Sequence, residues 1–216
     1  MNSTVFLKIG NYSVKIMRSG KIADLSDASS LRYSGAERII YFSTNRFAEK
    51  RIIAELKGMR PEKVVPADMR YIKNGYAVPA RIGIDRLLGC EYIMRERGKK
   101  DFVLVDLGTA YTVNIVKKGI LEGGFIVPSI RIYLGAVSSI GDLPEVSGIP
   151  RRKKIGKDTK ENILCGADLV YRSFFDRIYG TYGDVYATGG DKAAMAYIDR
   201  IRYIPECALK ALQAYE

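Results

Sequence analysis

The first hundred residues alternate short apolar runs with glycine-containing turns, a pattern typical of β-strands joined by tight turns. The expected strands span residues 4–9, 12–17, 21–25, 38–42 and 64–65. The apolar positions take the helical spacing at residues 47–56 and 84–97, so two helices are predicted there. Lys57-Gly58 ends the first helix, and Gly98 is suited to cap the second.

Residues 102–127 repeat the opening order of strand, glycine turn, strand, glycine turn and strand. Gly10 aligns with Gly108, and Gly20 aligns with Gly119. Because both glycine turns coincide, the repeat favours a duplicated domain over the alternative of two unrelated β-meanders.

The elements expected after the repeat are a helix, a strand and a short helix, at residues 160–179, 185–187 and 206–214. Asp158 and Glu161 have the spacing of a capping box at the start of the long helix. Meanders followed by helices predict an α/β fold of mixed sheets with flanking helices. We divide the chain into an N-terminal half, residues 1–98, and a C-terminal half, residues 99–216.

The composition sets the class of protein. The chain has 216 residues, of which 47% are apolar, enough to bury a core. No run of 18 apolar residues predicts a membrane span, and the N-terminus does not resemble an export signal. Its three cysteines are far apart and odd in number, which is typical of a reducing compartment, so we expect a cytoplasmic protein.

The charged residues narrow the chemistry. The chain has no histidine, which excludes histidine triads, histidine metal sites and histidine proton relays. Proton transfer near neutral pH then falls to Asp, Glu, Lys, Tyr or Cys. The net charge of +11 favours anionic ligands, although a solvated basic surface is the alternative. Only residues 151–154 form a basic run, so no DNA-binding groove is predicted.

Each copy of the repeat places small and polar residues where a strand meets a glycine turn. The second copy has Asp106, Gly108, Thr109 and Thr112. The turn exposes N–H groups and hydroxyls that suit phosphate, and the carboxylate suits Mg²⁺. A plain β-turn is the alternative interpretation. In the first copy Lys8 stands at the acidic position, followed by Gly10 and Asn11.

Two further segments are candidates for ligand contacts. Gly83-Ile84-Asp85-Arg86 lies at a helix start after Tyr76, where the aspartate is either a helix cap or a functional carboxylate. Thr188-Gly189-Gly190 follows a strand and is either a common turn or a close approach to a nucleotide.

These residues, taken in order, resemble the type III pantothenate kinases, also called the Baf (Bvg accessory factor) family, within the acetate kinase–sugar kinase–Hsp70–actin superfamily. The segments that carry the resemblance are Gly10-Asn11, Tyr76-x-x-Pro79, Gly83-x-Asp85-Arg86, Asp106-x-Gly108-Thr109-Ala110-x-Thr112, Gly123-Gly124-x-Ile126-x-Pro128, Leu143-Pro144, Gly156-x-x-Thr159 and Thr188-Gly189-Gly190.

The resemblance implies a duplicated ribonuclease H-like, actin-like ATPase fold. It implies ATP-dependent phosphorylation of pantothenate to 4'-phosphopantothenate, the first step of coenzyme A biosynthesis. The implied cofactors are ATP, Mg²⁺ and a monovalent cation, K⁺ or NH₄⁺. A cytoplasmic homodimer with the active site at its interface is expected, and nucleic acid and membranes are not expected partners.

The resemblance also assigns roles to residues. Asp85 would be the general base on the pantothenate hydroxyl, and Asp106 would hold the metal ion. Pantothenate would be bound by Tyr76, Gly83, Arg86 and Thr159, the threonine reaching the pocket of the partner subunit. The phosphates of the nucleotide would be bound by Lys8, Gly10, Asn11, Gly108, Thr109, Thr112, Gly189 and Gly190.

The chain departs from the family pattern on the nucleotide side. The family motif D-x-G-N-T is here Lys8-Ile9-Gly10-Asn11-Tyr12. One hypothesis is that ATP use is lost or weakened, which would make the protein a ligand-binding or Baf-type accessory regulator. A second is that the ammonium of Lys8 holds a phosphate and leaves Mg²⁺ to Asp106. A third is that Lys8 simply faces solvent. Another small-molecule kinase of the superfamily is a further alternative, although the pantothenate-side residues match.

Overall fold

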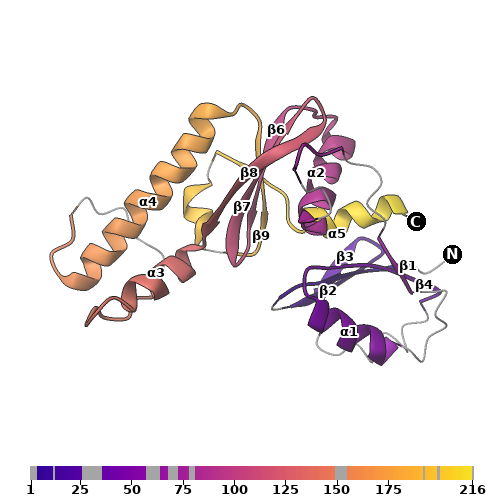
Figure 1. Cartoon of the computed structure of the whole chain (residues 1–216), viewed down its shortest axis with the longest axis horizontal. Helices are drawn as coiled ribbons and strands as arrows, with labels where there is room; N and C mark the ends of the chain where they lie inside the picture. Colours follow the sequence, from indigo (N-terminus) through magenta and orange to yellow (C-terminus); the bar gives the residue numbers. More distant parts are fainter. Residues whose placement is uncertain are drawn as a thin grey trace. The chain divides into compact units, whose positions relative to one another are not determined.

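A computed structural model of the chain describes residues 4–11, 13–25, 36–56, 64–67, 73–77, 81–148, 155–191, 193–198 and 200–215 (Figure 1). The chain forms two compact units. Unit 1 comprises Met1–Lys99 together with Glu206–Glu216, and unit 2 comprises Lys100–Pro205.

Unit 1 contains a five-stranded sheet in the order β3-β2-β1-β4-β5. Its elements are β1 (Thr4–Ile9), β2 (Val14–Arg18), β3 (Lys21–Asp24), β4 (Arg38–Ser43), α1 (Arg46–Glu55), β5 (Val64–Pro66), α2 (Ile84–Arg97), α5 (Cys207–Ala211) and the 3₁₀ helix η6 (Leu212–Tyr215). Strand β1 pairs antiparallel with β2 and parallel with β4.

Alternation along β1 divides the side chains of unit 1 between two cores. Val5 and Leu7 pack with Ile52 of α1, whereas Phe6 packs with Leu88 of α2 and Leu209 of α5. Helix α1 therefore covers one face of the sheet, and α2 and α5 cover the other (Figure 1).

The C-terminal segment differs from the predicted division of the chain. Residues 206–216, expected in the C-terminal half, belong to unit 1. The physical reason is burial, because Leu209 and Leu212 are fully buried in the same core as Leu88. The Tyr215 hydroxyl also donates a 2.8 Å hydrogen bond to Glu91 of α2.

Unit 2 repeats the topology of unit 1, with the sheet order β10-β9-β6-β7-β8. Its elements are β6 (Phe102–Leu107), β7 (Ala110–Lys117), β8 (Ile120–Pro128), α3 (Ile130–Ser138), α4 (Thr159–Thr181), β9 (Val185–Gly189), the 3₁₀ helix η5 (Ala194–Tyr197) and β10 (Arg202–Tyr203). The central strand β6 pairs antiparallel with β7 and parallel with β9, as β1 does with β2 and β4. The predicted α/β fold of two mixed sheets with flanking helices is confirmed.

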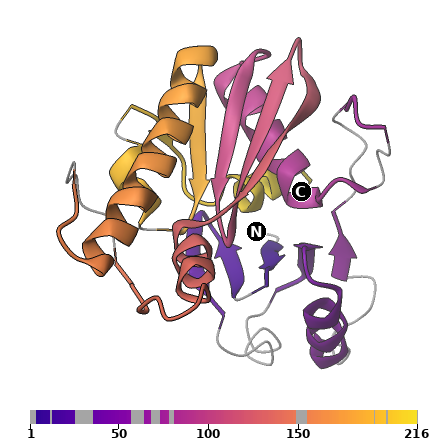
Figure 2. The same ribbon diagram turned by 60° about the vertical axis from the view of Figure 1, so that its left-hand side comes forward.

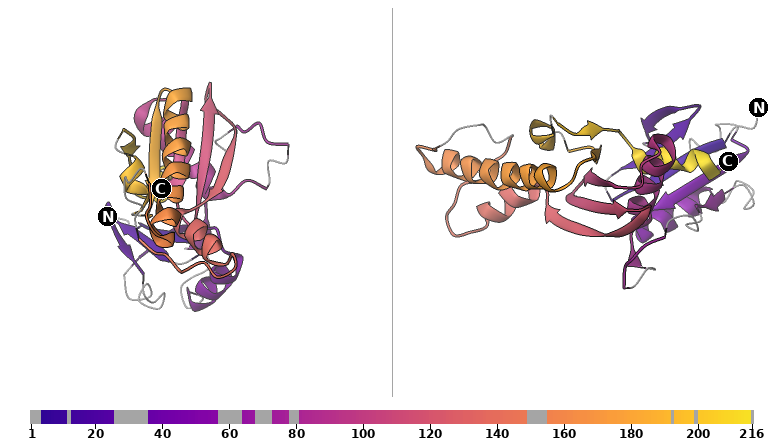
Figure 3. Two further views of the ribbon diagram at one scale, coloured as in Figure 1. Left: turned by 90° about the vertical axis from the view of Figure 1, so that its left-hand side faces the viewer. Right: turned by 90° about the horizontal axis from the view of Figure 1, so that it is seen from above.

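The core of unit 2 lies between its sheet and the helices α3, α4 and η5 (Figure 2, Figure 3). Tyr171 and Phe175 of α4 pack edge-on and tilted against Tyr111 of β7. Gly124 of β8 allows β8 to approach β7 closely, because a Cβ there would lie 1.7 Å from the carbonyl oxygen of Val113. In the part of the chain that the structure describes, no helix is long and apolar enough to cross a membrane.

Candidate functional site

Three polar side chains form a row across unit 2. Asp106 on β6 is the register partner of Thr112 on β7 and of Thr188 on β9. The three therefore lie side by side on one face of the sheet, with adjacent strands about 4.8 Å apart. Val105 and Leu107, which flank Asp106, face the hydrophobic core on the other side. The row presents one carboxylate between two hydroxyls.

The glycine turns of unit 2 lie at the end of this row. Gly108 and Thr109 follow β6, and Gly189 ends β9 just before Gly190. Gly189 has φ +100°, and a Cβ there would lie 2.5 Å from the carbonyl oxygen of Leu107, so only glycine fits. The fold thus gathers the predicted phosphate residues of unit 2 with Asp106 at one end of the sheet.

A buried hydroxyl supports these turns from the core side. Tyr111 is fully buried, and its hydroxyl donates a 2.6 Å hydrogen bond to Oδ2 of Asp191. The same hydroxyl accepts a 3.2 Å hydrogen bond from the N–H of Ile130. Burial and the hydrogen bond to Asp191 raise the pKa of Tyr111, so the hydroxyl stays protonated and remains a donor.

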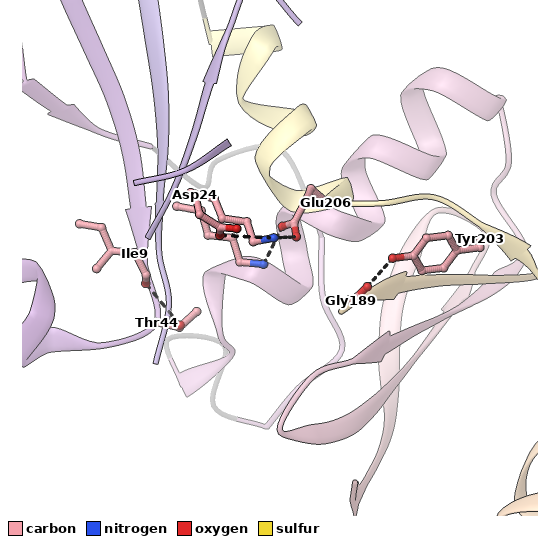
Figure 4. A network of polar contacts seen from close by, with 8 residues as sticks. Ile9, Asp24, Thr44, Gly189, Tyr203 and Glu206 are labelled. Atoms are coloured by element: carbon pink, nitrogen blue, oxygen red, sulfur yellow. Dashed lines mark hydrogen bonds and ion pairs between the residues drawn. The ribbon is translucent and has the colours of Figure 1, made fainter. Parts of the chain in front are cut away.

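In unit 1 the residue at the acidic position of the motif takes part in an ion network. Lys8 and Lys15 are register partners on β1 and β2, so their side chains share a face. Glu206 contacts both, with 2.9 Å to the Nζ of Lys8 and 3.0 Å to the Nζ of Lys15 (Figure 4). The Nζ of Lys15 also lies 3.8 Å from the exposed carboxylate of Asp24. Lys8 therefore does not simply face solvent.

Glu206 is held in an unusual state for a glutamate. Its side chain is 10% exposed, and its backbone is left-handed, with φ 53°. Burial opposes ionisation, but the charges and hydrogen bonds of Lys8 and Lys15 outweigh it and lower the pKa of Glu206. The carboxylate is therefore ionised at neutral pH and shared by two ammonium groups.

The pantothenate-side residues predicted in unit 1 meet at the start of α2. Arg86 donates a 2.5 Å hydrogen bond from Nη2 to the hydroxyl of Tyr76, and its Cζ lies 5.3 Å from the centre of that ring. Gly83 is the N-cap residue, and among the described residues no side chain forms a capping hydrogen bond at this end of the helix. A Cβ on Gly83 would lie 2.5 Å from Oδ1 of Asp85, so the glycine leaves space for this carboxylate.

Thr159, the remaining residue predicted to bind pantothenate, belongs to unit 2 rather than to unit 1. It is the first residue of α4 in unit 2 and is exposed, after the N-cap residue Asp158. The side chain of Asp158 accepts a 2.8 Å hydrogen bond from the N–H of Glu161, as the predicted cap requires. Contact between Thr159 and a partner subunit stays a prediction.

Comparison with known proteins identifies the family. The sequence profile described as type III pantothenate kinase matches residues 21–181, most of the chain. The chain belongs to the type III pantothenate kinase family.

Curated type III pantothenate kinases include similar sequences. The protein of Thermosipho melanesiensis is 39% identical over 90 residues, 41% of this chain and 36% of that protein. That of Persephonella marina is 36% identical over 133 residues, 59% of this chain and 52% of that protein. The match therefore spans about a third to a half of these relatives. That of Campylobacter jejuni is 26% identical over 90% of this chain and 88% of that protein.

Solved structures agree with the fold. A Campylobacter jejuni protein described as a Baf family transcriptional activator has a TM-score of 0.70 at 22% identity, over 97% of this chain and 96% of that chain. A Sinorhizobium meliloti protein described as a 2-dehydro-3-deoxygalactonokinase has a TM-score of 0.57 at 11% identity, over 98% of this chain and 97% of that chain. At these identities the likeness shows the fold alone.

Of the two equivalent positions in the repeat, Asp106 in unit 2 has the side-chain chemistry to hold a metal ion and Lys8 in unit 1 does not. Mg²⁺ in phosphoryl-transfer sites is held by one or two carboxylates with phosphate oxygens and water, which suits Asp106 between two hydroxyls. At the equivalent position of unit 1, Lys8 replaces the carboxylate, and Glu206 is engaged by two lysines. Within the described ranges, no cluster of three Cys, Asp or Glu side chains forms a metal cage.

Sequence reasoning missed Glu206 and Tyr111, and it did not place Thr188, which it named only as part of a turn, beside Asp106. Thr188 completes the row with Asp106, but its place depends on the parallel pairing of β6 with β9. Glu206 lies 198 residues from Lys8 in sequence, so no local pattern connects them. Tyr111 aligns with Tyr12 when one inserted residue is allowed in the sequence repeat, but its hydroxyl contacts Asp191, 80 residues away, which no local pattern predicts.

Proposed function

We propose that the protein catalyses ATP-dependent phosphorylation of pantothenate to 4'-phosphopantothenate, the first step of coenzyme A biosynthesis. The observation that carries the proposal is the group at the start of α2. There Gly83 leaves space for the carboxylate of Asp85, and Arg86 is joined to Tyr76. Membership of the type III pantothenate kinase family supports the same substrate.

In this reaction Asp85 would act as general base. Its carboxylate would accept the proton of the pantothenate hydroxyl as that oxygen attacks the terminal phosphorus of ATP, while the bond from this phosphorus to the bridging oxygen breaks and ADP leaves. Arg86 supplies a fixed charge, because the hydrogen bond to Tyr76 and the contact with its ring restrict the guanidinium. A restricted guanidinium suits the carboxylate end of pantothenate.

The residues of unit 2 would bind the phosphates. Gly108, Thr109, Gly189 and Gly190 offer turns, and Asp106 would hold Mg²⁺ beside the hydroxyls of Thr112 and Thr188. When bound there, Mg²⁺ neutralises charge on the transferred phosphoryl group. A monovalent cation, K⁺ or NH₄⁺, remains part of the proposal from the family resemblance.

We also propose that the protein is a homodimer. Unit 2 exposes apolar side chains on α3 and α4, which are Ile132, Leu169 and Val170. Leu169 and its neighbour Val170 are 68% and 45% exposed, and adjacent exposed apolar side chains are candidates for a protein–protein contact. Sedimentation equilibrium tests this proposal, and a Leu169→Lys variant should shift the protein towards the monomer.

A coupled assay with pantothenate, ATP, Mg²⁺ and K⁺ tests the reaction. We expect Asp85→Asn to reduce kcat by about 100-fold or more, the usual effect of losing a general base. Glu37→Gln, an exposed carboxylate just before β4, is the matched control and should leave kcat unchanged. An unchanged rate for Asp85→Asn contradicts the role of the base.

A second candidate function is a regulator or ligand-binding protein without kinase activity. The replacement of the motif acid by Lys8, paired with Glu206, favours it. Binding of pantothenate without ADP release would support this function, and a salt-dependent shift of DNA would support a nucleic-acid role. The Lys8→Asp variant separates the two hypotheses about Lys8. A gain of kinase activity indicates that ATP use was weakened by the loss of the acid, and a loss of activity indicates that the ammonium of Lys8 takes part in the reaction.

A further inference from the structure

We propose that Tyr111 is a positioning residue for nucleotide binding, because its buried hydroxyl holds the turn at residues 189–191 in place. The inference rests on the proposed function, in which Gly189 and Gly190 contact the phosphates. Tyr111 itself lies in the core and would touch neither substrate.

The turn is held at three points, one of which is the hydroxyl of Tyr203, which donates a hydrogen bond to the carbonyl oxygen of Gly189 (Figure 4). On one side, the N–H groups of Gly190 and Asp191 both donate 3.0 Å hydrogen bonds to the carbonyl oxygen of Leu107, the last residue of β6. On the other side, Oδ2 of Asp191 accepts the 2.6 Å hydrogen bond from Tyr111, while Oδ1 accepts a 2.9 Å bond from the N–H of Ala193. Gly189 is also held by its pairing with Leu107, so the carboxylate of Asp191 supports mainly the Gly190 side of the turn.

The hydroxyl of Tyr111 connects three segments of unit 2. It extends from β7, binds the turn after β9, and accepts the N–H of Ile130 at the start of α3. Ile130 is buried, so this N–H has no access to water in exchange. Removing the hydroxyl would leave a carboxylate and an N–H without this partner, and the turn would lose its support on one side.

The hydrogen bonds of the Tyr111 hydroxyl do not involve the residues of the family motif. The pattern Asp106-x-Gly108-Thr109-Ala110-x-Thr112 leaves the position of Tyr111 open, so the motif residues remain intact in a Tyr111→Phe variant. The phenyl ring keeps the packing against Tyr171 and Phe175, and only the hydroxyl is lost.

The chain offers a matched control. Tyr171 is also buried, its ring lies 5.7 Å from that of Tyr111, and its hydroxyl donates a 2.9 Å hydrogen bond to the carbonyl oxygen of Pro128. Tyr171→Phe therefore removes a buried hydroxyl from the same cluster, and the hydrogen bond that is lost goes to Pro128 and not to the turn at residues 189–191. Thermal unfolding of both variants reports the shared structural cost.

The experiment measures ADP binding by calorimetry with Mg²⁺ present, together with KM for ATP and for pantothenate in the whole protein. For Tyr111→Phe we expect the Kd of ADP and the KM of ATP to rise about tenfold, the effect of one hydrogen bond to a charged group. The KM of pantothenate should change less than twofold. Tyr171→Phe should leave all three constants unchanged.

A second variant tests the acceptor. Asp191→Asn keeps an oxygen for the hydroxyl of Tyr111, so we expect a smaller rise in the Kd of ADP than with Asp191→Ala. The double variant with Tyr111→Phe and Asp191→Ala should be no weaker than Asp191→Ala alone, because both remove the same bond.

The inference is overturned if Tyr111→Phe binds ADP as wild type does, if Tyr171→Phe weakens ADP binding equally, or if the wild-type protein binds no ADP. It is supported if only the Tyr111 variant loses ADP affinity. That result can be obtained even where pantothenate is not phosphorylated, so failure of the proposed function is distinguished from failure of this inference.

Discussion

Because Glu206 is shared by Lys8 and Lys15, we predict that removing its charge lowers the free energy of unfolding. Glu206→Gln keeps the size of the side chain but leaves Lys8 and Lys15 as like charges directly opposite each other on paired strands. Removing one partner of a fully buried ion pair costs about 3–5 kcal/mol. Lys8 and Lys15 are 23% and 26% exposed, so solvent screens part of the attraction and we expect a loss of about 2 kcal/mol.

Urea and thermal unfolding at pH 7 measure this loss. For a chain of this size, a change of about 2 kcal/mol corresponds to a fall of about 4–8 °C in Tm. Glu122→Gln is the matched control, because Glu122 lies 3.7 Å from Lys117 in an exposed pair. An exposed pair contributes about 0–1 kcal/mol, so the control should leave Tm nearly unchanged.

The pH dependence has a definite sign. The pKa of Glu206 is lowered from its usual 4.5, so the carboxylate stabilises the folded state fully above that pH. This contribution disappears as the pH falls through the lowered value. The difference in unfolding free energy between wild type and Glu206→Gln should therefore be largest at neutral pH and become small in acid.

A charge exchange separates the ion network from other causes. Lys8→Glu combined with Glu206→Lys again places one carboxylate among two ammonium groups, and it should recover at least half of the stability lost by Lys8→Glu alone. Equal stability of Glu206→Gln and wild type at pH 7, or no recovery in the exchanged protein, would refute the role that we give to this network.

Three further predictions concern single residues. Gly83→Ala should lower kcat of the kinase reaction about tenfold with little change in Tm, because the new methyl group displaces only the end of the Asp85 side chain. Steady-state kinetics measure kcat, and thermal unfolding measures Tm. Gly189→Ala should instead cost about 2–3 kcal/mol of stability, seen in urea unfolding, because φ is +100° and the methyl group meets backbone. Burial raises the pKa of the Cys90 thiol, so Ellman's reagent should label the partly exposed Cys165 in the native protein and Cys90 only after unfolding.

The repeated meanders were predictable because strand alternation and glycine turns are local signals. Helix α3 was missed for a physical reason, since its sequence is rich in β-branched and aromatic residues that favour strands locally. Its helical state depends on Ser129, which caps it by accepting a 3.4 Å hydrogen bond from the N–H of Ile132, and on burial of Ile130 and Leu134. A cap and a tertiary contact decide the structure here, and neither is visible in periodicity.

The candidate site was predictable to a similar depth. The motif at the start of α2 is short in sequence, so Gly83, Asp85 and Arg86 could be found together. The partner of Lys8 could not, because α5 returns to unit 1 only through burial of its leucines against α2. A lysine at a motif position therefore has no defined meaning until the residue that neutralises it is known.

The two repeated units keep one topology but carry different charges at the same position. Asp106 and Lys8 both lie on the central strand, two residues before the turn glycine. In unit 1, Glu206 cancels one of two lysine charges and Asp24 is too exposed to cancel the other strongly, so the network keeps close to one positive charge. A carboxylate that holds Mg²⁺ has the same net charge. Because Glu206 neutralises one lysine, the positive charge that would hold a phosphate in place of Mg²⁺ depends on Lys15 as well as on Lys8. The replacement of the motif acid by lysine therefore does not by itself imply an inactive protein.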